Sequence, residues 1–252
     1  MRKLMAGGIA AAVLTVTAPA AVSATASSTP SSTPSKVYVV HGLPLDDQGT
    51  KVDVYAGAAG AGPAAAGLVA DDFTFGSTAG PLSLAPASYD VYVAAPTASD
   101  DGVLRTNEVL FSKTLAVPAG KNLSAVASFD AAGAPTINVF TNDTRRTGLL
   151  TGRLSIRHAA AAPAVNVDLG LYPFARFAPR LFTTRVGPVA NGQQADRTVL
   201  GARYDVTVRV AASGAKVASV PKFKVDRKTL TAVYAVGVPG SSFGFVVQKL
   251  PL

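Results

Sequence analysis

The sequence contains no cysteine and no tryptophan, and it has only two histidines. The absence of cysteine excludes a disulfide-stapled scaffold, a cysteine nucleophile and a cysteine-ligated metal site. Each domain must therefore be held together by its apolar core, which about 100 residues can supply with a modest margin. The chain of 252 residues accommodates one large domain or two of about that size.

Long apolar runs are also scarce, and the run near the start is typical of a targeting segment. Arg2 and Lys3 precede an uncharged apolar stretch over residues 4–18, which small residues follow. This pattern predicts a cleaved signal peptide over residues 1–26, and the Ser/Thr/Pro sequence over 27–35 predicts a linker. Because no later apolar run is long enough to span a bilayer, we expect a secreted, extracellular protein that is released or held non-covalently at the cell wall.

One pattern occurs twice along the chain. A short strand ends in His41 or His158, a Pro-containing turn follows, and a second short strand ends before Gly. Tyr-Asp-Val recurs 48 residues after the first histidine and 46 after the second, at Tyr89 and Tyr204. A Lys-x-Leu-x-Ala-Val segment follows in each half. Aligning the two segments makes Leu123 equivalent to Leu230. Landmarks in one order with similar spacing indicate an internal duplication.

The duplication predicts two all-β domains. Short β-branched and aromatic runs between turn residues predict seven strands in the first repeat, and no window carries a sustained helical period. We expect two Ig-like antiparallel β-sandwich domains in tandem, because this number of strands in roughly 100 residues is typical of that fold. The expected repeats are residues 36–140 and 153–252, joined by a linker over 141–152. The first repeat's expected strands are 37–40, 52–55, 73–75, 86–93, 109–117, 123–129 and 137–140, with a flexible loop over 56–70.

The residues that open each repeat resemble a known family. The segment from His158 to Gly170 and the later Gly-Ala-Arg-Tyr-Asp-Val-Thr-Val are similar to tandem copies of the secreted bacterial domain of unknown function 4397 (DUF4397). The second copy lacks the family's Ser-Pro after His158 and has Asn166 where the pattern has Asp, whereas the first keeps Asp53. The resemblance implies a secreted or surface β-sandwich and brings no established activity, so no functional residue is transferred.

Charge is divided between the two halves. Residues 25–150 carry seven Lys and Arg against eleven Asp and Glu, a net charge of −4. Residues 151–252 carry fourteen against four, a net charge of +10. Either the two domains attract each other, or the basic half presents a surface for anionic polymers such as cell-wall phosphate chains. The predicted signal peptide and the absence of a recognition motif argue against nucleic acid as a partner.

The two histidines allow two interpretations. Each ends an opening strand beside a strand that carries Asp53 or Asp168, so it could be a metal ligand or a general base. Alternatively, its ring nitrogens could tie the Pro turn to the backbone. We expect structural roles for His41 and His158, because one histidine per domain without cysteine makes a poor transition-metal site.

Acidic pairs and a serine motif are further candidates for chemistry. Three Asp-Asp pairs, which could gather around Ca²⁺ or be solvated loop charges, lie in predicted loops and lack the spaced Asp-x-Asp-x-Asp-Gly pattern. We expect solvated charges and no metal or other cofactor. Gly240–Gly244 matches Gly-x-Ser-x-Gly, but a strand rather than a helix follows and no histidine comes later. We therefore predict a hairpin turn there and no serine hydrolase. The acidic pairs are Asp46-Asp47, Asp71-Asp72 and Asp100-Asp101.

The strongest binding candidate is a stretch that interleaves aromatic residues with arginine. Such side chains could offer stacking faces and cations to a sugar polymer or a polyanion, or the rings could pack into the sandwich. The candidate residues are Tyr172, Phe174, Arg176, Phe177 and Arg180.

From these features we expect a non-catalytic cell-envelope binding or structural module. Its partner would be an anionic cell-wall polymer or a surface protein, and its oligomeric state is left open. The alternative is a secreted single-site hydrolase or metal-binding protein that uses His41 and nearby carboxylates.

Overall fold

The structure is a computed structural model, which describes residues 33–44, 51–96 and 103–252. The expected signal peptide, residues 27–32 of the expected linker and the pairs Asp46-Asp47 and Asp100-Asp101 lie outside the described residues. No helix in the covered ranges is both long enough and apolar enough to cross a membrane.

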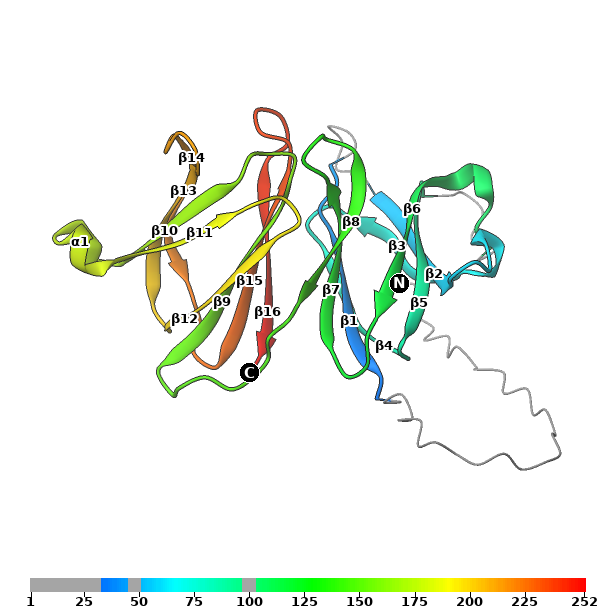
Figure 1. The fold of residues 1–252 in the computed structure, drawn as a ribbon, viewed down its shortest axis with the longest axis horizontal. Coiled ribbons are helices and arrows are strands. Elements are labelled where there is room, and N and C mark those ends of the chain that lie inside the picture. Colours follow the sequence, from blue (N-terminus) through cyan, green and yellow to red (C-terminus); the bar gives the residue numbers. More distant parts are fainter. Residues whose placement is uncertain (1–32, 45–50, 97–102) are drawn as a thin grey trace, which may run out of the picture. The chain divides into compact units, whose positions relative to one another are not determined.

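The first repeat forms two four-stranded sheets, which Figure 1 shows as two layers. One sheet has the strand order β4-β1-β7-β8 and the other has the order β3-β2-β5-β6. Two single 3-10 turns, η1 (Pro63–Ala65) and η2 (Thr106–Glu108), lie in the connections. The strands are β1 (Ser35–His41), β2 (Lys51–Ala58), β3 (Gly67–Thr74), β4 (Thr78–Leu84), β5 (Ala87–Ala94), β6 (Val109–Val117), β7 (Asn122–Phe129) and β8 (Pro135–Thr141).

The second repeat has the same architecture. Its sheets have the orders β12-β9-β15-β16 and β11-β10-β13-β14. A 3-10 turn η3 (Phe174–Arg176) and the short helix α1 (Pro179–Phe182) connect β10 to β11. The strands are β9 (Thr151–Ala160), β10 (Val165–Leu171), β11 (Thr183–Val189), β12 (Gln194–Leu200), β13 (Arg203–Val210), β14 (Lys216–Lys224), β15 (Thr229–Gly237) and β16 (Gly244–Pro251).

The all-β prediction is confirmed, with one correction to the pairing. Most neighbouring strands are antiparallel, but β1 pairs with β7 in parallel, and β9 pairs with β15 in parallel. Each repeat therefore contains one parallel pair inside an otherwise antiparallel sandwich. The expected hairpin turn at Gly240–Gly244 is also confirmed, because it lies between the antiparallel strands β15 and β16.

Two edge strands differ from the prediction. Residues 67–74, expected as the end of a flexible loop and a short strand at 73–75, form β3, and β4 was not predicted. The sequence of β4 contains Gly80 and Pro81, which weaken a strand pattern. Both strands lie at sheet edges, where proline is tolerated. Because these edge strands are largely exposed, their sequences need not alternate between apolar and polar residues. The pair Asp71-Asp72 therefore lies in a strand rather than in a loop.

The duplicated tyrosines have the same local structure. The Tyr89 hydroxyl donates to the Ala85 carbonyl at 3.0 Å, and the Tyr204 hydroxyl donates to the Leu200 carbonyl at 2.9 Å. Each hydrogen bond spans four residues and ties a strand to the corner before it, as in the tyrosine corner of other sandwiches. These contacts support the match between the two repeats.

The Lys-x-Leu-x-Ala-Val match, by contrast, is displaced by one residue. Val37 pairs with Leu123, whereas Leu154, which lies at the equivalent distance before its histidine, pairs with Thr231. Leu123 therefore corresponds to Thr231 and not to Leu230. Both β7 and β15 are buried on two faces, so their apolar sequence does not fix which face each residue takes.

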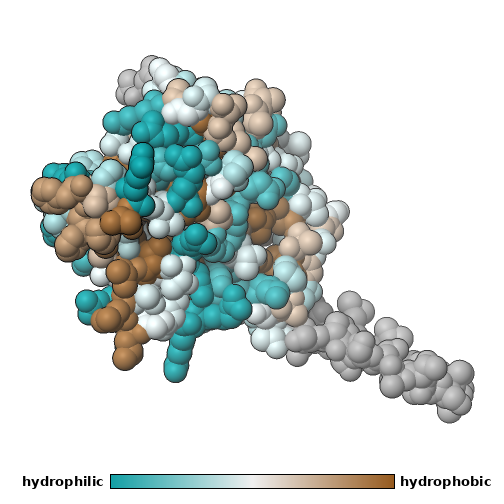
Figure 2. Space-filling view, turned by 60° about the vertical axis from the view of Figure 1, so that its left-hand side comes forward, coloured by the Kyte–Doolittle hydropathy of each residue, from teal (hydrophilic) through white to brown (hydrophobic). Residues whose placement is uncertain are grey.

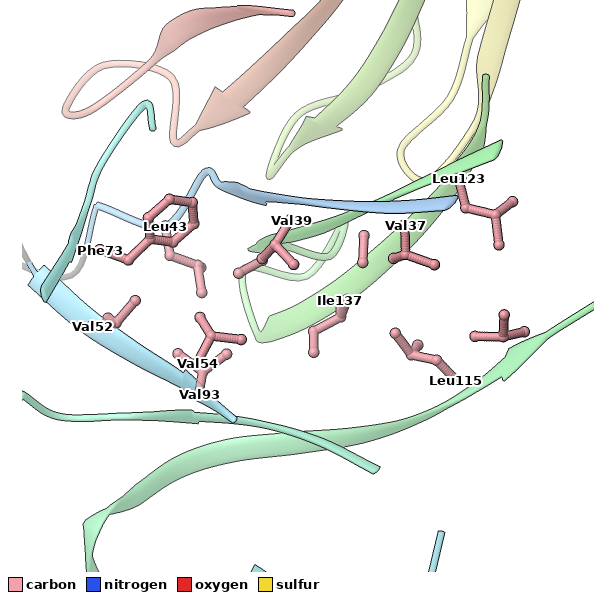
Figure 3. Close-up of a cluster of buried hydrophobic side chains, with 13 residues drawn as sticks. Val37, Val39, Leu43, Val52, Val54, Phe73, Val93, Leu115, Leu123 and Ile137 are labelled. Atoms are coloured by element: carbon pink, nitrogen blue, oxygen red, sulfur yellow. The ribbon is translucent and has the colours of Figure 1, made fainter. Parts of the chain in front are cut away.

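Each sandwich has its own apolar core between its sheets. The first core is shown in Figure 3, where Val37 and Val39 from one sheet face Val54 and Val93 from the other. Full burial of one such side chain stabilises a protein by about 1.5–3 kcal/mol. The second core contains the equivalent positions of β9, β10 and β13, among them Leu154, Val167 and Val208.

A third cluster joins the two sandwiches. Val40, Val126 and Phe140 of the first repeat pack with residues of the second, which are Ala159, Ala232, Tyr234, Val236 and Val246. Both sandwiches accordingly belong to one compact unit, residues 31–252.

Candidate functional site

Both histidines lie in the interior of their sandwiches. His41 is fully buried, its Nδ1 accepts a hydrogen bond from the Leu43 amide at 3.3 Å, and its ring stacks on Phe73 with centroids 5.9 Å apart. His158 is 1% exposed, and its Nδ1 accepts from the Ala160 amide, also at 3.3 Å. The two side chains thus make the same contact with the residue two positions later.

A second contact sets the protonation of His158. Its Nε2 lies 2.9 Å from the Pro163 carbonyl oxygen, so Nε2 carries the proton and donates it while Nδ1 accepts. Burial lowers the pKa of His158, because the charged form loses its hydration. Both nitrogens of the neutral His158 ring are therefore hydrogen-bonded to the backbone, which is the geometry that a structural role needs. That role stays a prediction.

Three carboxylates gather in the first sandwich. Asp53, Asp71 and Asp72 each offer an oxygen, and these oxygens lie within 4.8 Å of one another. Asp53 is buried and accepts from the Asp72 amide at 2.9 Å, while Lys51 pairs with Asp72 at 2.9 Å. Each carboxylate can offer one or two oxygens, and Ca²⁺ takes six to eight, so these three groups would complete a calcium site only if each bound through both oxygens. This group was not predicted from the sequence, because the register of β2 against β3, and not sequence distance, brings Asp53 beside Asp72.

The aromatic stretch forms an exposed lobe between β10 and β11. We call residues 172–182 the aromatic lobe; it contains η3 and α1, neither of which has a buried residue. In the first sandwich, the equivalent connection from β2 to β3 is built only from Gly, Ala and Pro, with no aromatic residue. The lobe is therefore a feature of the second copy and not of the shared fold.

The tip of the lobe presents apolar side chains to solvent. Phe177 is 85% exposed and Leu181 is 80% exposed, while the rings of Phe174 and Phe182 pack together with centroids 5.4 Å apart. Figure 2, which brings forward the side of the molecule that carries α1 in Figure 1, shows hydrophobic side chains projecting beside hydrophilic ones. Exposed apolar groups that gather in one place mark interaction sites more often than scattered ones do.

At the base of the lobe, where Tyr172 follows β10, two cations contact one aromatic ring. The Arg176 guanidinium lies over the Tyr172 ring at 4.7 Å, and the Lys222 ammonium lies over the same ring at 5.3 Å. Arg176 also pairs with Asp205 at 2.9 Å. This hydrogen bond from Arg176 is the main cause that lowers the pKa of Asp205 and raises the pKa of Arg176.

The five predicted binding residues therefore divide into two groups. Tyr172 and Arg176 form the paired base, whereas Phe177 lies at the tip and Phe174 packs on Phe182. Arg180 lies on α1 and forms no ion pair with any residue in the described part of the chain. Leu181 was not among the predicted binding residues, although it lies within the same interleaved stretch and its exposure makes it part of the tip.

Comparison with known proteins adds little about the lobe. No curated protein matches the chain. Among solved structures, the Bacillus anthracis TIE protein is 7% identical with a TM-score of 0.24, covering 81% of this chain and 34% of that one. The chain thus spans about a third of that structure.

Two structures from Bacteroides are similarly distant. A candidate cell adhesion protein from Bacteroides fragilis is 9% identical with a TM-score of 0.23, covering 88% of this chain and 97% of that one. A candidate polysaccharide-binding protein from Bacteroides thetaiotaomicron is 8% identical with a TM-score of 0.22, covering 87% and 98%. Structural similarity at TM-scores this low gives no information about function.

A family match is more informative. The family DUF4397, described as a domain of unknown function, matches residues 35–168. This range is more than half of the chain and contains the first sandwich, β9 and most of β10. The chain therefore belongs to the DUF4397 family.

Proposed function

We propose that this protein is a non-catalytic binding or structural module of the cell envelope, and that its aromatic lobe contacts an anionic cell-wall polymer. The observation that carries the proposal is the exposure of Phe177 and Leu181 on a lobe that the first sandwich lacks. Apolar side chains at 80% exposure or more gain stability only when a partner covers them.

The charges around the lobe support an anionic partner. Arg180 accompanies the apolar tip, and the surrounding half of the chain has a net charge of +10. Arginine presents a rigid fork of donors that matches phosphate and carboxylate oxygens. Arg176 contributes less free charge, because Asp205 already pairs with it.

The buried histidines support a role without catalysis. A general base must come within about 2.6–3.2 Å of the proton that it removes, directly or through one water. His41 is fully buried, and both ring nitrogens of His158 are used inside the fold. Among the described residues, His41 does not belong to the Asp53 carboxylate group. The hydrolase alternative therefore has no accessible histidine in this structure.

Binding of the full chain to purified cell wall tests the proposal. The Phe177→Ser/Leu181→Ser variant should lose most of the bound fraction, because it removes the apolar tip. The matched control is Leu149→Ser/Leu150→Ser, which changes leucines that are 74% and 58% exposed but lie far along the chain from the lobe. Both variants should keep wild-type stability within about 0.5 kcal/mol, as is usual for exposed positions.

The charge contribution is measured separately in the same assay. Arg180→Ser should weaken binding more than Lys216→Ser, although both remove one positive charge from the second sandwich. Wild-type binding should weaken as salt rises, since exposed charges are screened beyond about 8 Å at physiological ionic strength. Wild-type binding by the Phe177→Ser/Leu181→Ser variant, or binding that salt does not affect, would contradict the proposal.

A further inference from the structure

The core of the second sandwich encloses a large apolar cavity. Its volume is about 190 Å³, and residues from both sheets line it, including Val167 and Val208 on one side and Val233 on the other. The equivalent space in the first sandwich, lined by Val54 and Val93, has a volume of only about 40 Å³. The two copies of one fold thus differ in how fully their cores are packed.

Three positions have smaller side chains in the second copy, and two of them pair with Val165 and Val208, which line the cavity. Leu43 lies two residues after its histidine, where the second copy has Ala160. Phe73 pairs with Val52, whereas Val189 pairs with the equivalent Val165. Phe111 pairs with Val93, whereas Ala218 pairs with the equivalent Val208. Each change puts a smaller side chain in the second core, and surrounding structure relaxes only partly when buried groups are removed.

The cavity wall is hydrocarbon. The two polar residues on its lining, His158 and Arg157, direct their polar atoms elsewhere. Both nitrogens of His158 bond to backbone, and the Arg157 guanidinium bonds to Tyr234 and Asn142 in the contact between the sandwiches. A cavity without polar partners holds water poorly and accepts apolar guests, as a dry cavity of about 150 Å³ accepts benzene.

We propose that the second sandwich binds one small uncharged hydrocarbon group, with the bulk of an aromatic ring, between its two sheets. A neighbouring cavity of about 90 Å³ shares His158, Val165, Val208 and Ala235 with the first, and Pro239 and Phe243 from the β15–β16 turn line it. The apolar space therefore continues from the core towards this turn. The site is separate from the aromatic lobe and does not depend on the function proposed for the lobe.

Benzene is a suitable probe, and the melting temperature (Tm) of the full chain is the measurement. A ligand that binds only the folded state raises Tm in a saturable way. We expect this rise in the wild type. In Val167→Phe, a ring on β10 occupies the cavity, so Tm without benzene should be higher than in the wild type, and the benzene-induced rise should be lost.

The matched control is Val54→Phe in the first sandwich. Val54 and Val167 hold equivalent positions and are both 2% exposed, but the space beside Val54 is too small for a ring. This variant should have a lower Tm and should keep the benzene-induced rise, because the second core is untouched. The proposal is overturned if benzene gives the wild type no saturable rise, if Val167→Phe keeps the full rise, or if Val167→Phe fails to fold, since the cavity would then not accept a ring.

Discussion

Histidine occurs twice in this chain, and the same residue-level geometry recurs at both positions. The ring of each histidine accepts from an amide two residues later, which fixes the chain where the opening strand turns. The sequence alone showed the equivalence of His41 and His158 and predicted this kind of contact. It could not show that the rings are buried, because burial depends on strands that are distant in sequence.

The lowered pKa of His158 predicts a pH dependence of stability. The unfolded chain takes up a proton as pH falls below about 6.5, the ordinary histidine value, whereas the folded state resists protonation. The His158 contribution is therefore complete above that pH and is lost as pH falls towards the lowered folded pKa. Chemical denaturation at pH 7.5 and pH 5 should show this loss of unfolding free energy.

The control variant is His158→Gln, whose side-chain amide offers a hydrogen-bond donor and an acceptor but does not titrate. Its unfolding free energy should fall less than that of the wild type between the two pH values. An equal fall in both proteins would show that other groups cause the pH dependence.

At the scale of elements, the central strands of the first sandwich were predictable, whereas two of its edge strands, β3 and β4, were not. The expected strand at 123–129 differs from the central strand β7 by one residue, and the expected strand at 109–117 coincides with the edge strand β6. Central strands are buried and carry long β-branched runs, so sequence pattern identifies them. The edge strands β3 and β4 contain Gly, Pro or Asp, and hydrogen bonds to a neighbour define them instead.

The aromatic lobe is an element whose removal should not affect the core. Replacing residues 172–182 with residues 59–66, the Ala/Gly/Pro connection of the first sandwich, deletes no buried side chain. We expect the unfolding free energy to change by less than about 1 kcal/mol, because surface changes away from buried features are small. Chemical denaturation checks this, and a loss of several kcal/mol would show that the lobe's rings stabilise the sandwich.

At the scale of the whole molecule, side chains buried between the sandwiches hold them together. Arg157 of β9 is fully buried in the contact, where its guanidinium donates to the Tyr234 hydroxyl at 2.5 Å, to Asn142 Oδ1 at 2.6 Å and to the Thr141 carbonyl at 3.1 Å. Burial lowers the pKa of Arg157, although arginine stays charged at ordinary pH. The cluster around it would be exposed if the sandwiches were separated near Gly152, so binding experiments need the full chain.

Loss of Arg157 should destabilise the protein. Arg157→Ala leaves a cavity and removes the donors for Tyr234 and Asn142, so unfolding free energy should fall by about 2–5 kcal/mol in chemical denaturation. Arg197→Ala is the control, since Arg197 lies exposed on β12 of the same sheet, and it should change stability by no more than about 0.5 kcal/mol. Equal effects from both variants would mean that the buried arginine does not stabilise the contact.

The sequence by itself determined the fold class, the duplication and the family resemblance, because these depend on local alternation and on spacing along the chain. It also identified the aromatic stretch of the second copy. The tertiary structure decided which residues of that stretch are exposed, that Arg157 is buried between the sandwiches, and that one core is looser than the other. Exposure, burial and cavity volume depend on which distant strands meet, and the one-residue displacement of Leu123 against Leu230 shows that similar apolar patterns can pair in different registers.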